Sequence, residues 1–162
     1  MSVNGAEPGD RLSAESDSVR VKAVVESHVP FDHVEIIVNG TVAVDNSVAA
    51  ASEHATVQRY QFEADVPLNH SSWIALRVRG GDHADVFDGP VWAHTSPVYV
   101  LKDDLPIRNP DDAEYFVEWI DQLLRVVAAR NRYASAEDRQ QVESLFQDAR
   151  AEFAHRAVRT VE

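Results

Sequence analysis

The stretch from Ser71 to Leu101 constrains the fold most, because it reads as two strands joined by a polar loop that contains glycine. Side chains of a strand alternate between its two faces, so Ile74, Leu76 and Val78 share one face and Trp73 lies on the other. The first face is a core face. Since the second face carries a tryptophan, it also needs a cover, and we expect this stretch to form the centre of a sheet.

Alternating apolar residues predict further strands on both sides of this centre. Val19 to Val25 and Tyr60 to Val66 each alternate with polar residues, and Asn39-Gly40 is suited to a two-residue type I′ turn between two strands. Around Asn4-Gly5 we expect a short strand and turn, then a polar loop up to Ser18, and a second loop from 47 to 55. The spacing predicts a chain that is mainly β with α, with an immunoglobulin-like antiparallel β-sandwich over residues 1–104.

The pattern changes to a helical period near Asn109. Asn109 is a suitable N-cap and Pro110 a suitable first helical residue, and an apolar stripe follows as far as Arg130. After a break, Ser135 begins a second helix. We expect residues 105–162 to form a C-terminal helical hairpin packed on the sandwich.

One face of the predicted sandwich is the candidate interface or ligand face. Trp73 and Arg77 precede the polar loop, and His94, Ser96 and Tyr99 follow it. Aromatic rings and an arginine on one sheet face are typical of sugar-binding surfaces. We expect instead that these residues pack under the helical hairpin, with Trp119 of the first helix covering Trp73 and Tyr99, and ligand binding is the alternative.

Composition excludes several classes of partner and site. The formal net charge is −12, which argues against nucleic acid or an anionic membrane as partner. Cysteine is absent, so there is no disulfide and no thiolate zinc site. No apolar run approaches the ~20 residues that span a bilayer, and the first residues lack the features of a signal peptide. We expect a soluble protein of unassigned compartment, with a homo-oligomer left open.

We predict no catalytic residue, no metal ligand and no cofactor in this chain. The seven histidines are scattered over different predicted elements: His28, His33, His54, His70, His83, His94 and His155. Asp82, Asp85 and Asp88 do not have the two-residue spacing of a calcium loop. His94 and Ser96 share a strand face, but side chains ~7 Å apart do not form a nucleophile and base pair. At Pro97 we expect the ladder to be interrupted, with nearby hydroxyls bonded to backbone groups.

Several segments of the chain resemble one family in order and spacing. They are VNGAEPGD from Val3, FDHVEIIVNG from Phe31, SSWIALRV from Ser71, AHTSPVYV from Ala93 and DDAEYFVEWIDQLL from Asp111. From about Val3 to about Ala154 the chain resembles the C-terminal region of CehA/McbA-type metallohydrolases of the PHP superfamily. This resemblance implies amide- or carbamate-type hydrolysis at divalent metal ions held in an N-terminal PHP barrel. This chain has no His-x-His pair, so none of the family's metal ligands is carried over.

Two functional hypotheses follow. The first is a non-catalytic accessory domain of a PHP-type metal-dependent hydrolase, with the N-terminal barrel as its partner and the chain as a piece of a longer protein. The second is a self-standing β-sandwich that binds carbohydrate or peptide.

Overall fold

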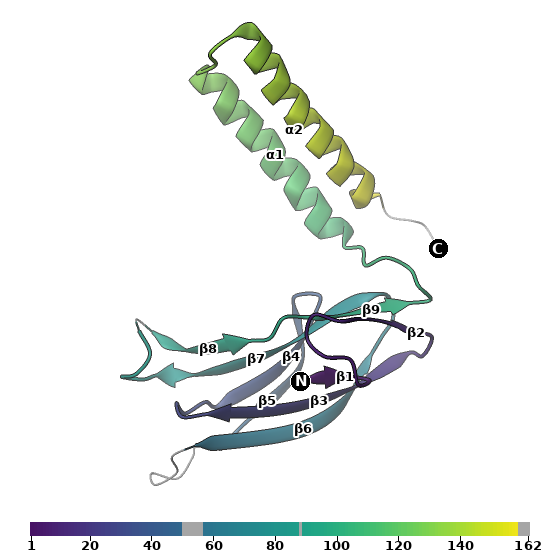
Figure 1. Cartoon of the computed structure of the whole chain (residues 1–162), viewed down its shortest axis with the longest axis vertical. Coiled ribbons are helices and arrows are strands. Elements are labelled where there is room, and N and C mark those ends of the chain that lie inside the picture. The colour runs from purple at the N-terminus through teal and green to yellow at the C-terminus, as the bar shows by residue number, and fades with distance from the viewer. Residues whose placement is uncertain (50–56, 88, 159–162) are drawn as a thin grey trace. The chain divides into compact units, whose positions relative to one another are not determined.

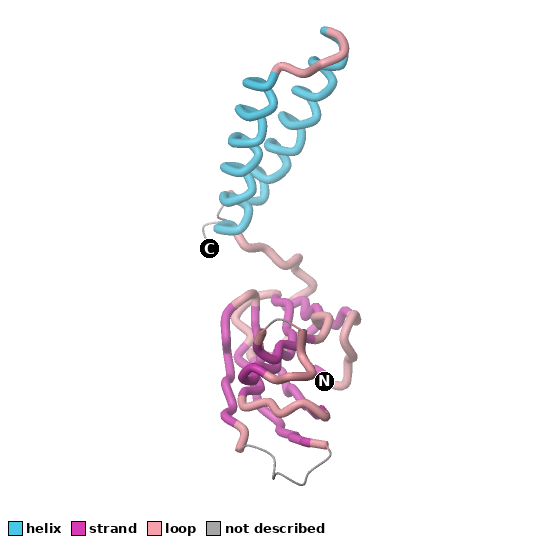
Figure 2. Tube along the Cα trace, turned by 90° about the vertical axis from the view of Figure 1, so that its left-hand side faces the viewer, coloured by secondary structure: helices cyan, strands magenta, loops and turns pink. Residues whose placement is uncertain are grey.

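The structure is a computed structural model that describes residues 1–49, 57–87 and 89–158. The chain divides into two compact units, Met1–Ile107 and Arg108–Glu162. The strands lie in the first unit and the two long helices in the second (Figure 1; Figure 2). The fold is therefore mainly β with two C-terminal helices, as the sequence predicts.

A three-stranded antiparallel sheet forms one side of the first unit. Its strands are β1 (Ser2–Val3), β3 (Ser18–Ser27) and β6 (Gln58–Pro67), in the order β1-β3-β6. In β3 every second side chain from Val19 to Val25 is buried, and the intervening ones are exposed. Arg20 of β3 pairs with Asp65 of β6 on the exposed face, with 2.6 Å between Nε and Oδ1. The predicted alternation is confirmed, and this sheet has a polar outer face.

A larger mixed sheet forms the other side. Its strands are β2 (Arg11–Ala14), β9 (Val98–Lys102), β7 (Ser72–Asp82), β4 (His33–Val38) and β5 (Thr41–Ser47), in the order β2-β9-β7-β4-β5, and β8 (Pro90–His94) also pairs with β7. β2 runs parallel to β9, and the other pairs are antiparallel. The prediction that the stretch from Ser71 to Leu101 lies at the centre of a sheet is confirmed, because β7 contacts β4, β8 and β9.

The predicted polar loop up to Ser18 is wrong over four residues. Arg11–Ala14 forms strand β2, in which Leu12 is the register partner of Val100. The segment has too few apolar residues for a recognisable strand pattern, and its pairing partner lies far away in the sequence. This strand therefore forms because it pairs with a strand that is distant in the sequence, and not because of local propensity. The predicted loop from 47 to 55 lies largely outside the described residues, and Ser47 itself ends β5.

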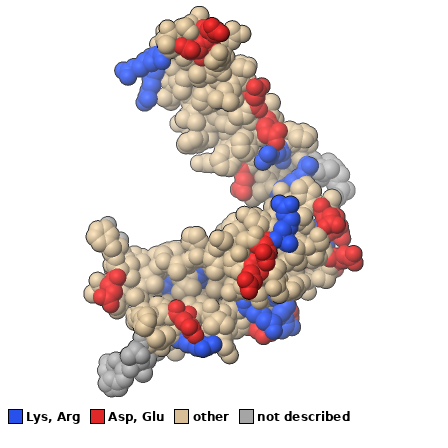
Figure 3. Space-filling view, in the orientation of Figure 1, with Lys and Arg blue, Asp and Glu red and all other residues tan. Residues whose placement is uncertain are grey.

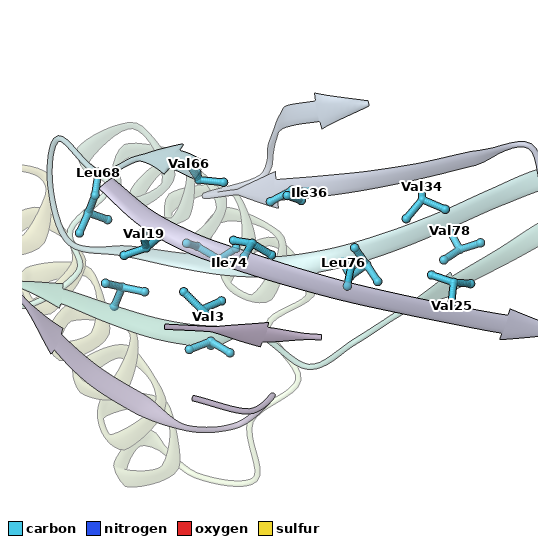
Figure 4. Close-up of a cluster of buried hydrophobic side chains, with 14 of the residues drawn as sticks. Val3, Val19, Val25, Val34, Ile36, Val66, Leu68, Ile74, Leu76 and Val78 are labelled. Carbon is cyan, nitrogen blue, oxygen red and sulfur yellow. The ribbon is translucent and has the colours of Figure 1, made fainter. Parts of the chain in front are cut away.

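Both sheets contribute to one hydrophobic core (Figure 4). Val19, Val21 and Val66 come from the small sheet, and Ile36 and Ile74 from the large one. Each of these five side chains is at most 1% exposed. Burial of one such side chain contributes about 1.5–3 kcal/mol before entropy is counted, so this core is the main stabilising feature of the first unit.

The second unit is a helical hairpin. α1 (Pro110–Arg130) begins after Asn109, whose side chain accepts a hydrogen bond from the Asp112 backbone N–H. α2 (Ala136–Ala157) begins after Ser135, which accepts in the same way from Asp138. These start signals confirm the predicted helices. Within the described residues, neither helix is long and apolar enough to cross a membrane.

The two helices are held together by apolar and charged contacts. The rings of Phe116 and Phe153 stack with centroids 4.9 Å apart, and Arg150 Nε lies 2.7 Å from Asp121 Oδ1. In α1, Ala113 and Ile120 are buried, whereas Trp119 is 49% exposed. The packing of this hairpin on the sheet stays a prediction.

The predicted Asn39-Gly40 turn is confirmed. Both residues have positive φ, 48° for Asn39 and 86° for Gly40, as a type I′ turn requires. The Asn39 side chain also accepts a hydrogen bond from the Trp73 backbone N–H at 3.0 Å and donates one to Ser72 Oγ at 3.1 Å. The turn therefore fixes β4 against the start of β7.

Replacing Gly40 with valine should lower the free energy of unfolding by about 1–3 kcal/mol, because valine strongly disfavours positive φ. A Cβ at Gly40 would meet no atom within 4 Å, so the cost comes from the backbone alone. The measurement is the urea midpoint. Gly81→Val is the matched control, since Gly81 has equal space and no positive φ. An equal midpoint for both variants would contradict the prediction.

Candidate functional site

The outer face of the large sheet, on the side away from the core, contains an open concavity of about 660 Å³. The residues that give it its chemical character come from β7, β8 and β9: Trp73, Ala75, Arg77, Trp92, His94 and Tyr99. Ser96 also lines it, from the segment between β8 and β9. We call this the outer-face concavity.

The strand register brings these side chains together. Trp73 on β7 is paired with Tyr99 on β9, and Arg77 further along β7 is paired with His94 on β8. Because side chains two residues apart share a strand face, Trp73, Ala75 and Arg77 form a row along β7. The concavity thus has an aromatic end at Trp73 and Tyr99 and a cationic end at Arg77.

A buried glutamate holds the cationic end. Glu35 is the register partner of Arg77, yet it is only 1% exposed. Its Oε2 accepts a short hydrogen bond from Arg77 Nε, and its Oε1 accepts from Arg79 Nε at 2.9 Å and Nη2 at 2.6 Å. One carboxylate therefore binds two arginines, and the arginine side chains are 31% and 33% exposed.

The electrostatic effect of this cluster is seen at Glu35. Burial raises the pKa of Glu35, but hydrogen bonds from Arg77 and Arg79 and the charges of both arginines outweigh it. The net result is a pKa of Glu35 below its usual value. The hydrogen bonding of Arg79 to the Glu35 carboxylate likewise raises the pKa of Arg79. Glu35 therefore remains ionised beside the two arginines, and the charges of Asp45 and Asp32 also act on Arg79.

Trp92 covers the arginines. Its ring lies 5.4 Å from the Arg77 guanidinium carbon and 5.9 Å from that of Arg79. A guanidinium over an aromatic face at this distance is stabilised by the ring's negative potential. Trp92 is still 58% exposed, so much of its ring faces solvent.

The predicted interruption at Pro97 is confirmed, since β8 ends at His94 and β9 begins at Val98. Thr95 bridges the gap: its backbone N–H donates to the Leu76 carbonyl at 3.0 Å, and its Oγ1 accepts from the Leu76 backbone N–H at 3.1 Å. His94 Nδ1 lies 3.2 Å from the Thr95 carbonyl oxygen and must donate to it. No hydrogen bond between His94 and Ser96 is seen in the described part of the chain.

Five of the six predicted site residues line the same concavity: Trp73, Arg77, His94, Ser96 and Tyr99. Trp119, the sixth, belongs to α1 in the second unit. Sequence reasoning missed Trp92 and Glu35. Trp92 stands two residues before His94, so period-two spacing could have found it. Glu35 stands between Val34 and Ile36, and a charged residue at that position of an apolar strand was the available signal.

Over residues 1–49, 57–87 and 89–158, no three histidine, aspartate or glutamate side chains are grouped as a metal site would need. His54 and Asp88, two residues weighed as possible ligands, lie outside the described residues.

Comparison with known proteins gave no match: no family model fits the chain, and neither the curated proteins nor the solved structures contain a significant relative.

Replacing Glu35 with glutamine should lower the free energy of unfolding by about 3 kcal/mol at neutral pH, because two arginines lose a buried partner. The pKa of Glu35 is lowered in the folded state, so its contribution is present above the unfolded value of about 4.3 and is lost as pH falls through the lower folded value. Urea unfolding from about pH 7 to about pH 3 should therefore show the two proteins converging.

Glu63→Gln is the matched control. The pKa of Glu63 is also lowered, chiefly by a hydrogen bond from Lys22, but its side chain is 47% exposed and solvent screens the interaction. Its effect should be much smaller. A difference between wild type and Glu35→Gln that stays constant with pH would contradict the ionised state assigned to Glu35.

Proposed function

We propose that this chain is a non-catalytic accessory domain of a PHP-type metal-dependent hydrolase, and that the outer-face concavity is its working surface, at an interface or at the substrate entrance. One observation carries the proposal. Three of the five segments that resemble the family line the concavity: FDHVEIIVNG supplies Ile37 and Gly40, SSWIALRV supplies Trp73 and Arg77, and AHTSPVYV supplies His94 and Tyr99.

The fold that goes with this proposal is an immunoglobulin-like sandwich. Support comes from two sheets that share one core and from the two-residue turn joining β4 and β5. The parallel β2 to β9 pair makes the large sheet mixed rather than purely antiparallel. Such a sandwich offers rigid strands, on which side chains can be held in fixed positions for binding.

The proposed partner is an N-terminal PHP barrel, which would hold the divalent metal ions and supply the hydrolytic chemistry on amide, carbamate or phosphoester-like bonds. This chain would contribute surface, not metal ligands. The net charge of −12 argues against nucleic acid and membrane as partners. On the face seen in Figure 3 acidic and basic side chains are interspersed, with no large basic patch. A homo-oligomer remains compatible with the proposal.

The second candidate function is a carbohydrate- or peptide-binding module. Trp92 at 58% and Tyr99 at 39% exposed favour it, because exposed rings on a rigid sheet face can stack on a ligand. Packing of the helical hairpin on this face, which the sequence predicts, is the competing hypothesis. A covered face would favour assembly, and an open face would favour ligand binding.

The isolated chain should not hydrolyse ester, amide or phosphodiester substrates, with or without added Mn²⁺ or Zn²⁺. The reason is that its sequence has no His-x-His pair and spreads its histidines over many elements. Product release from a chromogenic panel is the measurement. Metal-dependent turnover that disappears in His94→Ala would overturn the non-catalytic assignment.

The reading frame from which the chain comes should encode a PHP-type barrel upstream of Val3, and this is the decisive test of the proposal. In that whole protein, Trp73→Ala and Tyr99→Ala should change KM or the stability of the two-domain protein, and leave its metal content unchanged. Val24→Ala on the outer face of the small sheet is an exposed apolar control that does not line the concavity. An upstream coding region that encodes a different class of domain would contradict the accessory role.

A further inference from the structure

We propose that the outer-face concavity binds a small carboxylate attached to a ring, with the carboxylate on Arg77 and the ring on the apolar floor between Arg77 and Tyr99. The inference deepens the proposed function by naming a ligand class for that surface, and it rests on the surface being a binding surface.

Arg77 is the group that selects an anion. Among the described residues lining the concavity it is the only lysine, arginine, aspartate or glutamate. Glu35 is its one hydrogen-bond acceptor within the described chain, and it is engaged by Nε. The two Nη nitrogens are therefore left for a ligand, and a guanidinium presents them in the geometry that matches two carboxylate oxygens.

The charge balance of the cluster favours the same ligand. Glu35 supplies one negative charge against two positive charges from Arg77 and Arg79. Asp45 and Asp32 also act on Arg79, but neither lines the concavity, so Arg77 is the charged group that a ligand carboxylate would meet there. Glu35 and Trp92 already fix the position of the guanidinium, so little side-chain entropy is lost on binding.

The floor of the concavity suits a ring. Ala75 and Ile37 line the concavity between the two ends and are apolar, although only 8% and 7% of them is exposed. Arg77 stands four positions after Trp73 on the strand, a span of about 13 Å, which accommodates a ring and its carboxylate. Trp73 and its partner Tyr99 close the far end with aromatic surface against which a ring can pack.

His94 adds a polar group that distinguishes two kinds of ring. Its Nδ1 donates to the Thr95 carbonyl, so Nε2 of the neutral imidazole is an acceptor. A sugar acid has hydroxyl groups that could donate to Nε2, and an aromatic acid has none. Sugar acids and aromatic acids both carry a carboxylate attached to a ring. Probes of each kind therefore show which of these two ligand classes binds.

The test is calorimetric titration of the full chain with matched acid and amide probes. Phenylacetate is compared with phenylacetamide, and glucuronate with glucuronamide. We expect at least one acid to bind about tenfold more tightly than its amide, which corresponds to about 1.4 kcal/mol. The preference should shrink as salt is added, because it depends on charge.

Variants assign the preference to the site. Arg77→Gln should remove the difference between acid and amide, whereas Arg20→Gln, which alters a strand arginine paired with acids on the other sheet, should leave it intact. Ala75→Leu should weaken acid and amide together by filling the floor. If Arg77→Gln does not fold, Arg77→Lys tests the loss of the planar fork while keeping the charge.

Equal binding of acid and amide, or a preference that survives in Arg77→Gln and Arg77→Lys, overturns the ligand assignment and leaves the accessory role standing. Absence of binding by all four probes also overturns it. The accessory role is tested separately: an upstream coding region that contains no PHP-type barrel would contradict it.

Discussion

The shared core of the two sheets is the constraint on which the rest of the first unit depends. Inward positions of β3, β4, β7 and β9 are apolar and almost completely buried, which fixes the register of every strand. A slip of one residue would turn Ile74 and Leu76 to the outer face and Arg77 into the core. Outward positions are fixed in place as a consequence, without having to stabilise the fold themselves.

The two sheets use their outer positions differently. The small sheet places exposed ion pairs there, such as Arg59 with Glu26, which contribute little to stability and keep the face wet. The large sheet places aromatic residues and a buried carboxylate there. A glutamate that is 1% exposed on an outer face has a high desolvation cost, and its two arginine partners offset it. This asymmetry is what favours the large sheet as the proposed binding surface.

The elements of the fold were largely predictable because their signals are local. Alternation from Val19 to Val25, positive φ at Asn39-Gly40 and the caps Asn109 and Ser135 depend on residues close together in the chain. β2 was not predictable in this way. Its four residues become a strand only through a parallel ladder to β9, and no local pattern encodes a partner so far away.

The sequence by itself determined which residue types alternate, where turns and helices begin, and that Trp73 and Arg77 share one face of a strand, because period-two geometry follows from the chain alone. Only the register between β7 and β9 places Tyr99 opposite Trp73. Only the tertiary structure decided that Glu35 lies beneath Arg77 and Arg79, and that Trp92 covers both guanidiniums. Those contacts join β4, β7 and β8, and the register between strands is set by long-range pairing. The contacts within the site therefore depend on how β4, β7 and β8 pair, whereas the residue types on each strand are given by the sequence.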